Sequence, residues 1–272
     1  MKKLGYFISV FLVLLYACSN SVNPVNNNNN NSNYKKIFET GNGDSRFELY
    51  SASYDTLRSG YNDIGFKVYQ NSQEMTTGFV KFLPIMHHPP PITSYHSTPV
   101  CPQFNYDNDK KLFTGYASFI MVTDSFSNWY GFYNYNNSFY ADSILFKVVI
   151  NPYNQMKTFV DDSSSTSFWI TLVSPLNPVQ GLNDFKCLLH ITQDDIYYTE
   201  VDSAQMSIYP WMNLMGHSSS GNIQPSYTGG GIYAGKVNLN MSGDWWVYDT
   251  IHYWNRVVSI VNSPPKFILT SP

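Results

Sequence analysis

Charge is scarce in this 272-residue chain. Lys and Arg number 16, Asp and Glu number 19, and the four types make up 13% of the sequence, for a formal net charge of −3. Proteins that bind nucleic acid present a basic face to the phosphate backbone. The weakly acidic balance therefore excludes nucleic acid as an expected partner. The chain length suits one large domain or two of ordinary size.

Cysteine is scarce as well, with only Cys18, Cys101 and Cys187. If Cys18 carries a lipid, as argued below, the two cysteines that remain do not make a disulfide framework. An oxidising compartment would allow Cys101 and Cys187 to pair, but nothing in their wide spacing requires a bridge. We predict two buried thiols that do not form a disulfide.

The motifs of common enzyme classes are missing. The sequence has no Gly-x-Ser-x-Gly elbow and no His-Glu-x-x-His helix, and no lysine follows the glycines at 229–231, which predict a turn. Acidic pairs occur at 161–162 and 194–195. Neighbouring residues on a strand point to opposite faces, so neither pair can face a substrate together, and we expect solvated turns. We predict no catalytic residues and no enzyme activity.

The first residues have the features of an export signal. Lys2 and Lys3 give a positive start, and residues 4–16 form an apolar run that is short for a membrane span. Leu15-Tyr16-Ala17-Cys18 resembles a bacterial lipobox, although Tyr16 stands where a small residue is usual. We predict a lipoprotein signal peptide over 1–17 and a lipid on Cys18 that anchors the protein to the membrane. An ordinary secretory leader or an uncleaved anchor is the alternative interpretation.

A polar tether follows, over residues 18–44. It contains an unbroken asparagine run at 26–31, and sequence of this kind buries too little apolar area to become ordered. Residues 19–22 carry no acidic side chain after the lipidated cysteine. We therefore expect a lipid-anchored protein of the bacterial cell envelope that faces the periplasm from the outer membrane, rather than one on the cell surface.

Short alternating segments, rich in residues that favour strands, predict an all-β fold. Tyr and Phe number 22 and 18, and no long stretch combines a helical apolar period with helix caps. Strands are expected in five segments, over 64–69, 78–84, 112–121, 143–150 and 167–173. Strands at this spacing, separated by Asn, Gly, Pro and Ser, indicate a β-sandwich.

An internal repeat divides the chain into two modules. Four landmarks recur in the same order at nearly constant spacing, and the Trp near the end of each set corresponds as well. The pairs are Pro84-Ile85-Met86 with Pro210-Trp211-Met212, His96-Ser97 with His217-Ser218, 112–117 with 232–237, Met121 with Met241, and Trp129 with Trp245 or Trp246. We predict two tandem β-sandwiches over 45–137 and 138–262, and a C-terminal tail over 263–272.

The second module resembles a known family. Pro210-Trp211-Met212, the Met215-Gly216-His217 stretch and the strand at 231–245 are similar to the pattern of YtkA-like domains, which are related to FixH-like domains. This resemblance implies an immunoglobulin-like sandwich of an exported bacterial protein, with an association to copper or other metals. The first module, which lacks the Met-Gly-His triplet, is a degenerate copy.

Methionine and histidine gather at equivalent places in the two modules. Thioether sulfur selects soft ions such as Cu(I), and imidazole accepts Cu(I), Cu(II) and Zn. The candidate metal ligands are Met212, Met215 and His217 in the second module, and Met86, His87, His88 and His96 in the first. The alternative is structural, because Met often fills gaps in a core and His often caps a turn.

Aromatic runs at 129–133 and 245–248 suggest a second function. Exposed aromatic side chains mark surfaces that bind proteins or sugars. Trp245, at the family's tryptophan position, is expected in the core, and Trp246 is expected to point outward. The sequence thus leaves two hypotheses open. One is a non-catalytic module that binds a metal, and the other is a structural or adhesive module that binds a glycan or a protein of the envelope.

Overall fold

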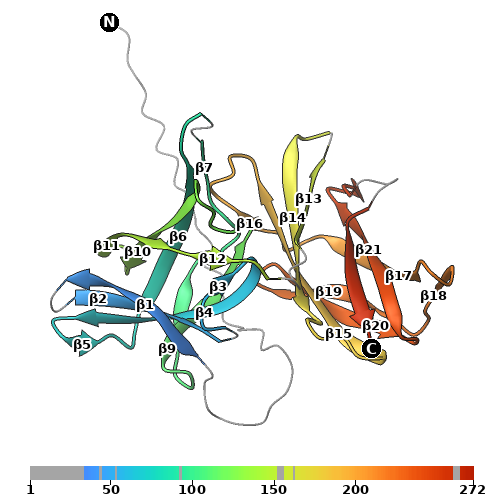
Figure 1. Cartoon of the computed structure of the whole chain (residues 1–272), viewed down its shortest axis with the longest axis horizontal. Helices are drawn as coiled ribbons and strands as arrows, with labels where there is room; N and C mark the ends of the chain where they lie inside the picture. The colour runs from blue at the N-terminus through green and yellow to red at the C-terminus, as the bar shows by residue number, and fades with distance from the viewer. Residues whose placement is uncertain are drawn as a thin grey trace, which may run out of the picture.

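A computed structural model describes residues 34–42, 45–52, 54–91, 94–151, 156–161, 163–259 and 264–272. The predicted signal peptide, Cys18 and the asparagine run lie outside the described residues. Within the described ranges, the regular structure is all strand, and there is no helix that is long and apolar enough to cross a membrane. The all-β prediction is confirmed (Figure 1).

The first module is built around one continuous sheet. Its strands are β1 (Lys35–Asn42), β2 (Ser45–Ser51), β4 (Gly60–Gln70), β5 (Gln73–Glu74), β6 (Phe79–His88), β7 (Ser94–His96), β8 (Phe104–Asp107), β9 (Leu112–Phe119), β10 (Asn128–Tyr135) and β11 (Phe139–Phe146). Their order is β1-β2-β4-β9-β8-β6-β10-β11, with β5 on β4 and β7 on β6. Beside this sheet, β3 (Leu57–Arg58) pairs in parallel with β12 (Val148–Val149).

The second module consists of two sheets. Its strands are β13 (Met156–Asp161), β14 (Thr166–Ser174), β15 (Gly181–Thr192), β16 (Thr199–Glu200), β17 (Gln205–Met212), β18 (His217–Ser218), β19 (Ile223–Gly229), β20 (Ile232–Leu239), β21 (Gly243–Tyr253), β22 (Arg256–Val257) and β23 (Lys266–Ser271). One sheet has the order β13-β14-β15-β20-β19, with β16 on β15. The other has the order β18-β17-β21-β22, with β23 also on β21.

The strand order confirms the tandem immunoglobulin-like sandwiches. In the second module β14-β15-β20-β19 follows the A-B-E-D order of that fold, and β17-β21-β23 follows C-F-G. The first module repeats both sets as β2-β4-β9-β8 and β6-β10-β11. It differs because β8 also pairs with β6, which joins its two layers. Phe38 on β1 stacks on Phe146 on β11 with ring centroids 6.0 Å apart, so this sheet curls back on itself.

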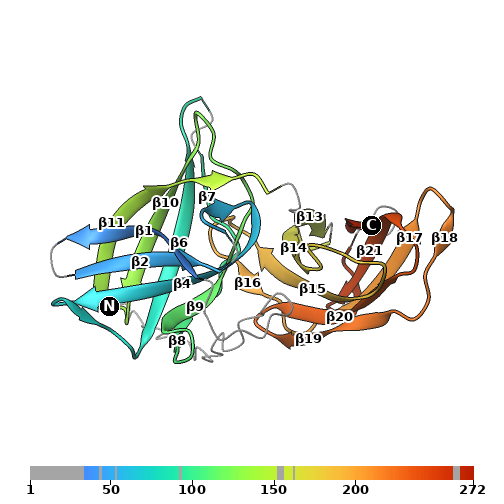
Figure 2. The ribbon, with the colours of Figure 1, turned by 60° about the horizontal axis from the view of Figure 1, so that its bottom comes forward.

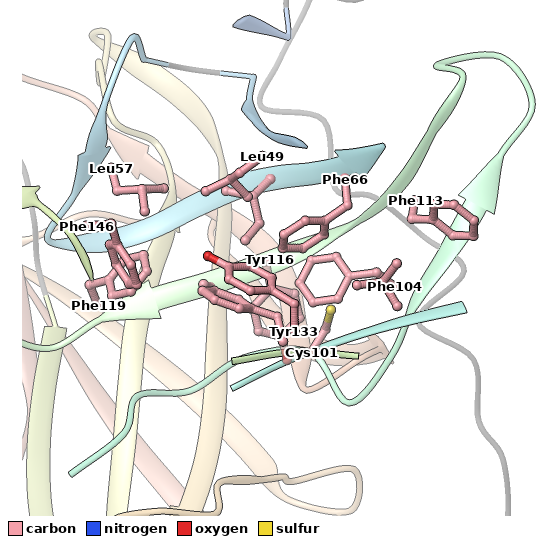
Figure 3. Close-up of a cluster of buried hydrophobic side chains, with 14 of the residues drawn as sticks. Leu49, Leu57, Phe66, Cys101, Phe104, Phe113, Tyr116, Phe119, Tyr133 and Phe146 are labelled. Carbon is pink, nitrogen blue, oxygen red and sulfur yellow. The ribbon is translucent and has the colours of Figure 1, made fainter. Parts of the chain in front are cut away.

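Each module has its own aromatic-rich core. In the first, Phe66, Phe104 and Tyr133 pack between the layers, as Figure 3 shows. In the second, the alternation along β21 buries Trp245 and leaves Trp246 half-buried on the outer face. The predicted assignment of these two tryptophans is confirmed.

The module boundaries differ from those predicted at 45, 137/138 and 262. β11 pairs with β10 and so belongs to the first module, which places the boundary after Val149. β1 falls inside the predicted tether and pairs with β2. β23 falls inside the predicted tail, yet it buries Phe267 and Leu269 in the second core.

The modules pack side by side, as Figures 1 and 2 both show. Leu188 and Ile232 of the second module join the core of the first. Close by, the Tyr116 hydroxyl donates to a Glu200 carboxylate oxygen at 2.6 Å and lies 2.9 Å from Nε2 of His190. Buried apolar contacts and a polar network therefore fix the modules against each other.

The cysteines are placed as predicted, whereas one of the acidic pairs is not. Cys101 and Cys187 are buried and are not joined in a disulfide, as predicted. Asp194 is in a turn, where it accepts hydrogen bonds from the amides of residues 196 and 197. Asp161 is not a solvated turn residue: its carboxylate is buried and forms a two-pronged ion pair with Arg256. A charge that is removed from water needs such a partner. Asp162 lies outside the described residues.

Candidate functional site

A Met, a His and a Trp meet at one end of the second sandwich. Met212, the last residue of β17, lies directly opposite His217 of β18. The next strand, β21, places the fully buried Trp245 beside them, and the His217 and Trp245 rings are nearly perpendicular, with centroids 5.5 Å apart and an interplanar angle of 82°. The indole nitrogen of Trp245 donates to the carbonyl of Met241 at 3.0 Å, which holds the loop before β21 against this end.

His217 presents one ring nitrogen to sulfur. Nδ1 lies 3.0 Å from the carbonyl oxygen of Ser218, which can only accept a hydrogen bond, so Nδ1 carries the proton. The other nitrogen of the neutral ring, Nε2, lies 3.2 Å from Sδ of Met241. The buried Met212 reaches the same loop, because a side-chain carbon placed on Gly243 would be 3.5 Å from its methyl group. An imidazole nitrogen and the Met241 sulfur thus lie in contact, and the methyl end of the Met212 thioether lies close to the residue at which β21 begins.

Met215, a predicted ligand, has a different place from the one expected. It lies in the turn between β17 and β18, where its amide donates to the carbonyl of Met212, and 57% of its surface is exposed. Its place next to His217 is taken by Met241, which is 24 residues away in the chain. In the sequence, Met241 stood out only as a repeat landmark opposite Met121, and that recurrence was the signal that could have identified it.

The first module builds the same framework. Met86 of β6 lies opposite His96 of β7 and, on its other side, opposite Trp129 of β10. The His96 and Trp129 rings are perpendicular, with centroids 5.4 Å apart and an interplanar angle of 90°. The indole nitrogen of Trp129 donates to the carbonyl of Met121 at 3.0 Å. Four residues therefore hold the same relative positions in both modules.

Here the histidine faces a second histidine. Nε2 of His96 lies 3.1 Å from Nε2 of His88. Nδ1 of His96 donates to the carbonyl of Ser97 at 2.9 Å, and Nδ1 of His88 lies 2.7 Å from the hydroxyl of Ser127. Burial, the largest cause, lowers the pKa of His96 below its usual value. A neutral His96 offers the lone pair of Nε2 to its neighbour.

The other two predicted ligands of the first module have different places. Met86 is fully buried and is paired with His96 across β6 and β7. His87 points to the opposite side of β6, as adjacent residues on a strand must, and it stacks on Tyr95 with centroids 4.7 Å apart at 13°. The structure thus brings together His88 and His96 and separates His87 from them.

The described residues of the two modules do not form the ligand set of a closed structural zinc site. Among the described residues there is no group of three or more His, Cys, Asp and Glu side chains placed to hold a metal ion. Any metal at these two places would depend on thioether sulfur in the second module, or on two imidazoles and open coordination positions in the first.

The outer face of the β17-β21-β23 sheet carries the aromatic residues of the second hypothesis. Tyr209 and Trp211 stack with ring centroids 6.1 Å apart at 21°, and Tyr209 is 52% exposed. Trp246 is covered in part by Lys266, whose Nζ lies 3.5 Å from the ring centroid. Of these rings Tyr209 is exposed, whereas Trp211 and Trp246 are half-buried.

Comparison with known proteins supports the family resemblance of the second module. A model of the YtkA-like family matches residues 162–248, which hold Met212, His217, Met241 and Trp245. That match covers about a third of the chain, from the end of β13 to the middle of β21. No curated protein sequence matches the chain.

Three solved structures show a distant likeness. They are the adhesin FdeC of Escherichia coli (11% identity, TM-score 0.26, 83% of this chain and 64% of that chain covered), a bacterial integrin-binding invasin (9%, 0.23, 82% and 39%) and the I67–I69 fragment of titin (9%, 0.20, 79% and 61%). This chain spans less than two-thirds of each. The fold assignment is based on the strand order and not on these likenesses.

Proposed function

We propose that the protein is an exported, lipid-anchored binding module without catalytic activity, and that its second module binds Cu(I). His217 and Met241 would be the primary ligands and Met212 a third. The observation that carries the proposal is the 3.2 Å approach of His217 Nε2 to Met241 Sδ, in a site where a second thioether, from Met212, reaches the same loop.

The chemistry of the donors favours a soft, monovalent ion. Thioether sulfur binds Cu(I) well, and it is a poor ligand for Mg²⁺ or Ca²⁺. All three donors are neutral, so one bound Cu⁺ leaves a single positive charge rather than two. With bond lengths of about 2.0 Å to nitrogen and about 2.3 Å to sulfur, as for zinc, the 3.2 Å separation corresponds to an angle of about 95° at the metal. A third donor fits beside such a pair.

The surroundings support binding at this place. The Nδ1 proton of His217 is held by the Ser218 carbonyl, which is the supporting contact that metal-binding histidines usually have. Trp245 closes the inner side of the site. Met241 is 39% exposed, so an ion can reach its sulfur from solvent.

The N-terminal sequence supports the location. A basic start, a short apolar run and Cys18 favour export and lipidation, and the polar segment up to residue 33 would separate the sandwiches from the membrane. In an oxidising compartment, a site made of Met and His needs no free thiol. We propose a position in the bacterial cell envelope that faces the periplasm.

Competition titration with a Cu(I) chelator tests the proposal. The chain from Ser19 to Pro272 contains every described residue and should bind one equivalent of Cu(I) through the second module. Met241→Leu and His217→Gln should each weaken this binding, whereas Met215→Leu, a matched removal of an exposed sulfur close by, should leave it unchanged. Loss of Cu(I) binding in Met215→Leu, or Cu(I) binding of unchanged strength in Met241→Leu, would overturn the ligand assignment.

A second candidate function rests on the stacked pair of Tyr209 and Trp211. Stacked rings of which one is exposed and the other half-buried offer a flat surface that suits sugar rings or an apolar protein surface. If this face binds glycans or envelope proteins, Trp211→Ala should abolish retention on a glycan or envelope-protein array. Met241→Leu should have no effect on it, which separates the two functions.

A further inference from the structure

The duplicated framework has diverged at one position, and the chemistry changes there. In the second module the ring nitrogen of the shared histidine faces Met241, and in the first it faces His88. We propose that the first module binds a divalent transition metal of the Zn²⁺ or Cu²⁺ class through His88 and His96. The inference rests on the proposed function only in sharing its framework, because the ligand pair and the expected ion are different.

The separation of the two nitrogens suits a shared ion. An ion at about 2.0 to 2.1 Å from each nitrogen, the usual distance for zinc and imidazole, would subtend about 100° between nitrogens 3.1 Å apart. This angle lies between the right angle of square-planar Cu²⁺ and the tetrahedral angle of Zn²⁺. The ion would replace the direct contact between the two rings, and small rotations of the rings are enough to open that contact.

Both rings are already oriented by other contacts. His96 uses Nδ1 to donate to Ser97, and His88 uses Nδ1 toward the buried hydroxyl of Ser127. Metal-binding histidines usually have such partners on the nitrogen that does not bind the metal, because the partners fix the tautomer and the ring. His96 Nε2 thus carries a lone pair, and metal binding would shift the His88 proton to Nδ1, where the Ser127 hydroxyl can accept it, so that both Nε2 atoms bind a common ion.

Two acidic residues are close to the pair. Asp124 accepts hydrogen bonds from the amides of Phe126 and Ser127, in the loop that carries the hydroxyl beside His88. Asp195 of the second module accepts a hydrogen bond on its carbonyl from the amide of Ser97, next to His96. Their negative charge favours a divalent cation at the histidine pair over a second neutral partner.

The β6–β7 hairpin does not depend on the contact between His88 and His96. His88 and His96 lie on paired strands, and Trp129 packs against the His96 ring from within. On the other side of the same hairpin, His87 stacks on Tyr95. The hairpin is therefore held by contacts independent of the histidine pair, so the pair can open around an ion without loss of the hairpin.

Calorimetric titration of Zn²⁺ and of Cu²⁺ into the chain from Ser19 to Pro272 tests the inference. One equivalent should bind, and His88→Gln or His96→Gln should weaken it by more than about tenfold, which is what loss of even a supporting group commonly costs. His87→Gln is the matched control on the same hairpin and should have no effect. Electron paramagnetic resonance of bound Cu²⁺ should show coupling to two imidazole nitrogens, and to fewer in either variant.

Two further variants separate this inference from the proposed function. Met241→Leu should abolish Cu(I) binding in the second module and leave Zn²⁺ binding intact, so each proposal can fail alone. His88→Met recreates the His–Met pair of the second module, and should lose Zn²⁺ and gain a second equivalent of Cu(I). Absence of Zn²⁺ and Cu²⁺ binding, or binding that both His→Gln variants retain while folded by circular dichroism, would overturn the inference.

Discussion

Replacing Asp249 with asparagine should remove a loss of stability that the protein suffers as the pH rises. Asp249 points into the second core from β21, is fully buried, and neither of its carboxylate oxygens has a hydrogen-bond partner among the described residues. Burial raises the pKa of this carboxyl well above its usual value, so the folded protein keeps it protonated. In the unfolded chain the same group ionises with a pKa of about 3.9.

The sign and size of the effect follow from this difference. Because the folded state keeps a proton that the unfolded state releases, the free energy of unfolding falls as the pH rises above about 4. Each pH unit above the pKa of the unfolded state costs about 1.4 kcal/mol until the pKa of the folded state is reached, so the loss from this one group grows steadily with pH over that interval. An asparagine side chain at this position has nearly the same shape and does not ionise in either state.

Urea unfolding at pH 5, 6 and 7 measures the effect. The unfolding free energy of the natural chain minus that of the Asp249→Asn variant should fall as the pH rises, with a slope of up to about 1.4 kcal/mol per pH unit. Asp202→Asn, which changes an exposed carboxylate of the same module, is the control and should show no such trend. Equal pH slopes for the natural chain and Asp249→Asn would refute the assignment of a protonated, buried carboxyl.

Two other buried ionisable groups give predictions. Burial lowers the pKa of His190 to about 3, so below about pH 6.5 the unfolded chain takes up a proton that the folded chain does not bind, and the free energy of unfolding should fall. In unfolding titrations, His190→Gln should recover about 2 to 3 kcal/mol of the loss between pH 6 and pH 4. Removing the partner of the buried Asp161 carboxylate by Arg256→Met should cost about 1 to 3 kcal/mol in the same assay, since the Arg256 side chain is partly exposed. The double variant with Asp161→Asn should be less destabilised than Arg256→Met alone, and equal losses in both would contradict a charge effect.

Much of the fold was predictable because the strands alternate cleanly and the landmarks recur. The landmarks have equivalent places in both modules: Met86 is near the end of β6 and Met212 is at the end of β17, and Trp129 and Trp245 are on the strands that pair with them. The missed strands are those whose partners the local sequence does not reveal. β1 is an edge strand and is rich in polar residues, so its sequence lacks a clear apolar alternation. β23 follows two prolines that resemble the start of a tail.

The candidate sites were predictable in residue type and only partly in membership. Proximity along the chain favoured Met215 over Met241, but a strand end and a distant loop meet in space through β pairing, and single-sequence patterns do not encode which loop that is. His88 and His96 are close in sequence and on one hairpin, so their convergence needed only a turn between them. Asp161 was misassigned for the same reason as Met215, since its partner Arg256 is 95 residues away.

X-ray absorption at the copper edge tests the central claim most directly. With one equivalent of Cu(I) bound to the chain from Ser19 to Pro272, the account predicts a first shell of one nitrogen at about 2.0 Å and at least one sulfur at about 2.3 Å, with sulfur scattering reduced in Met241→Leu and unchanged in Met215→Leu. A shell of nitrogen and oxygen alone, or sulfur scattering that survives intact without Met241, would contradict it.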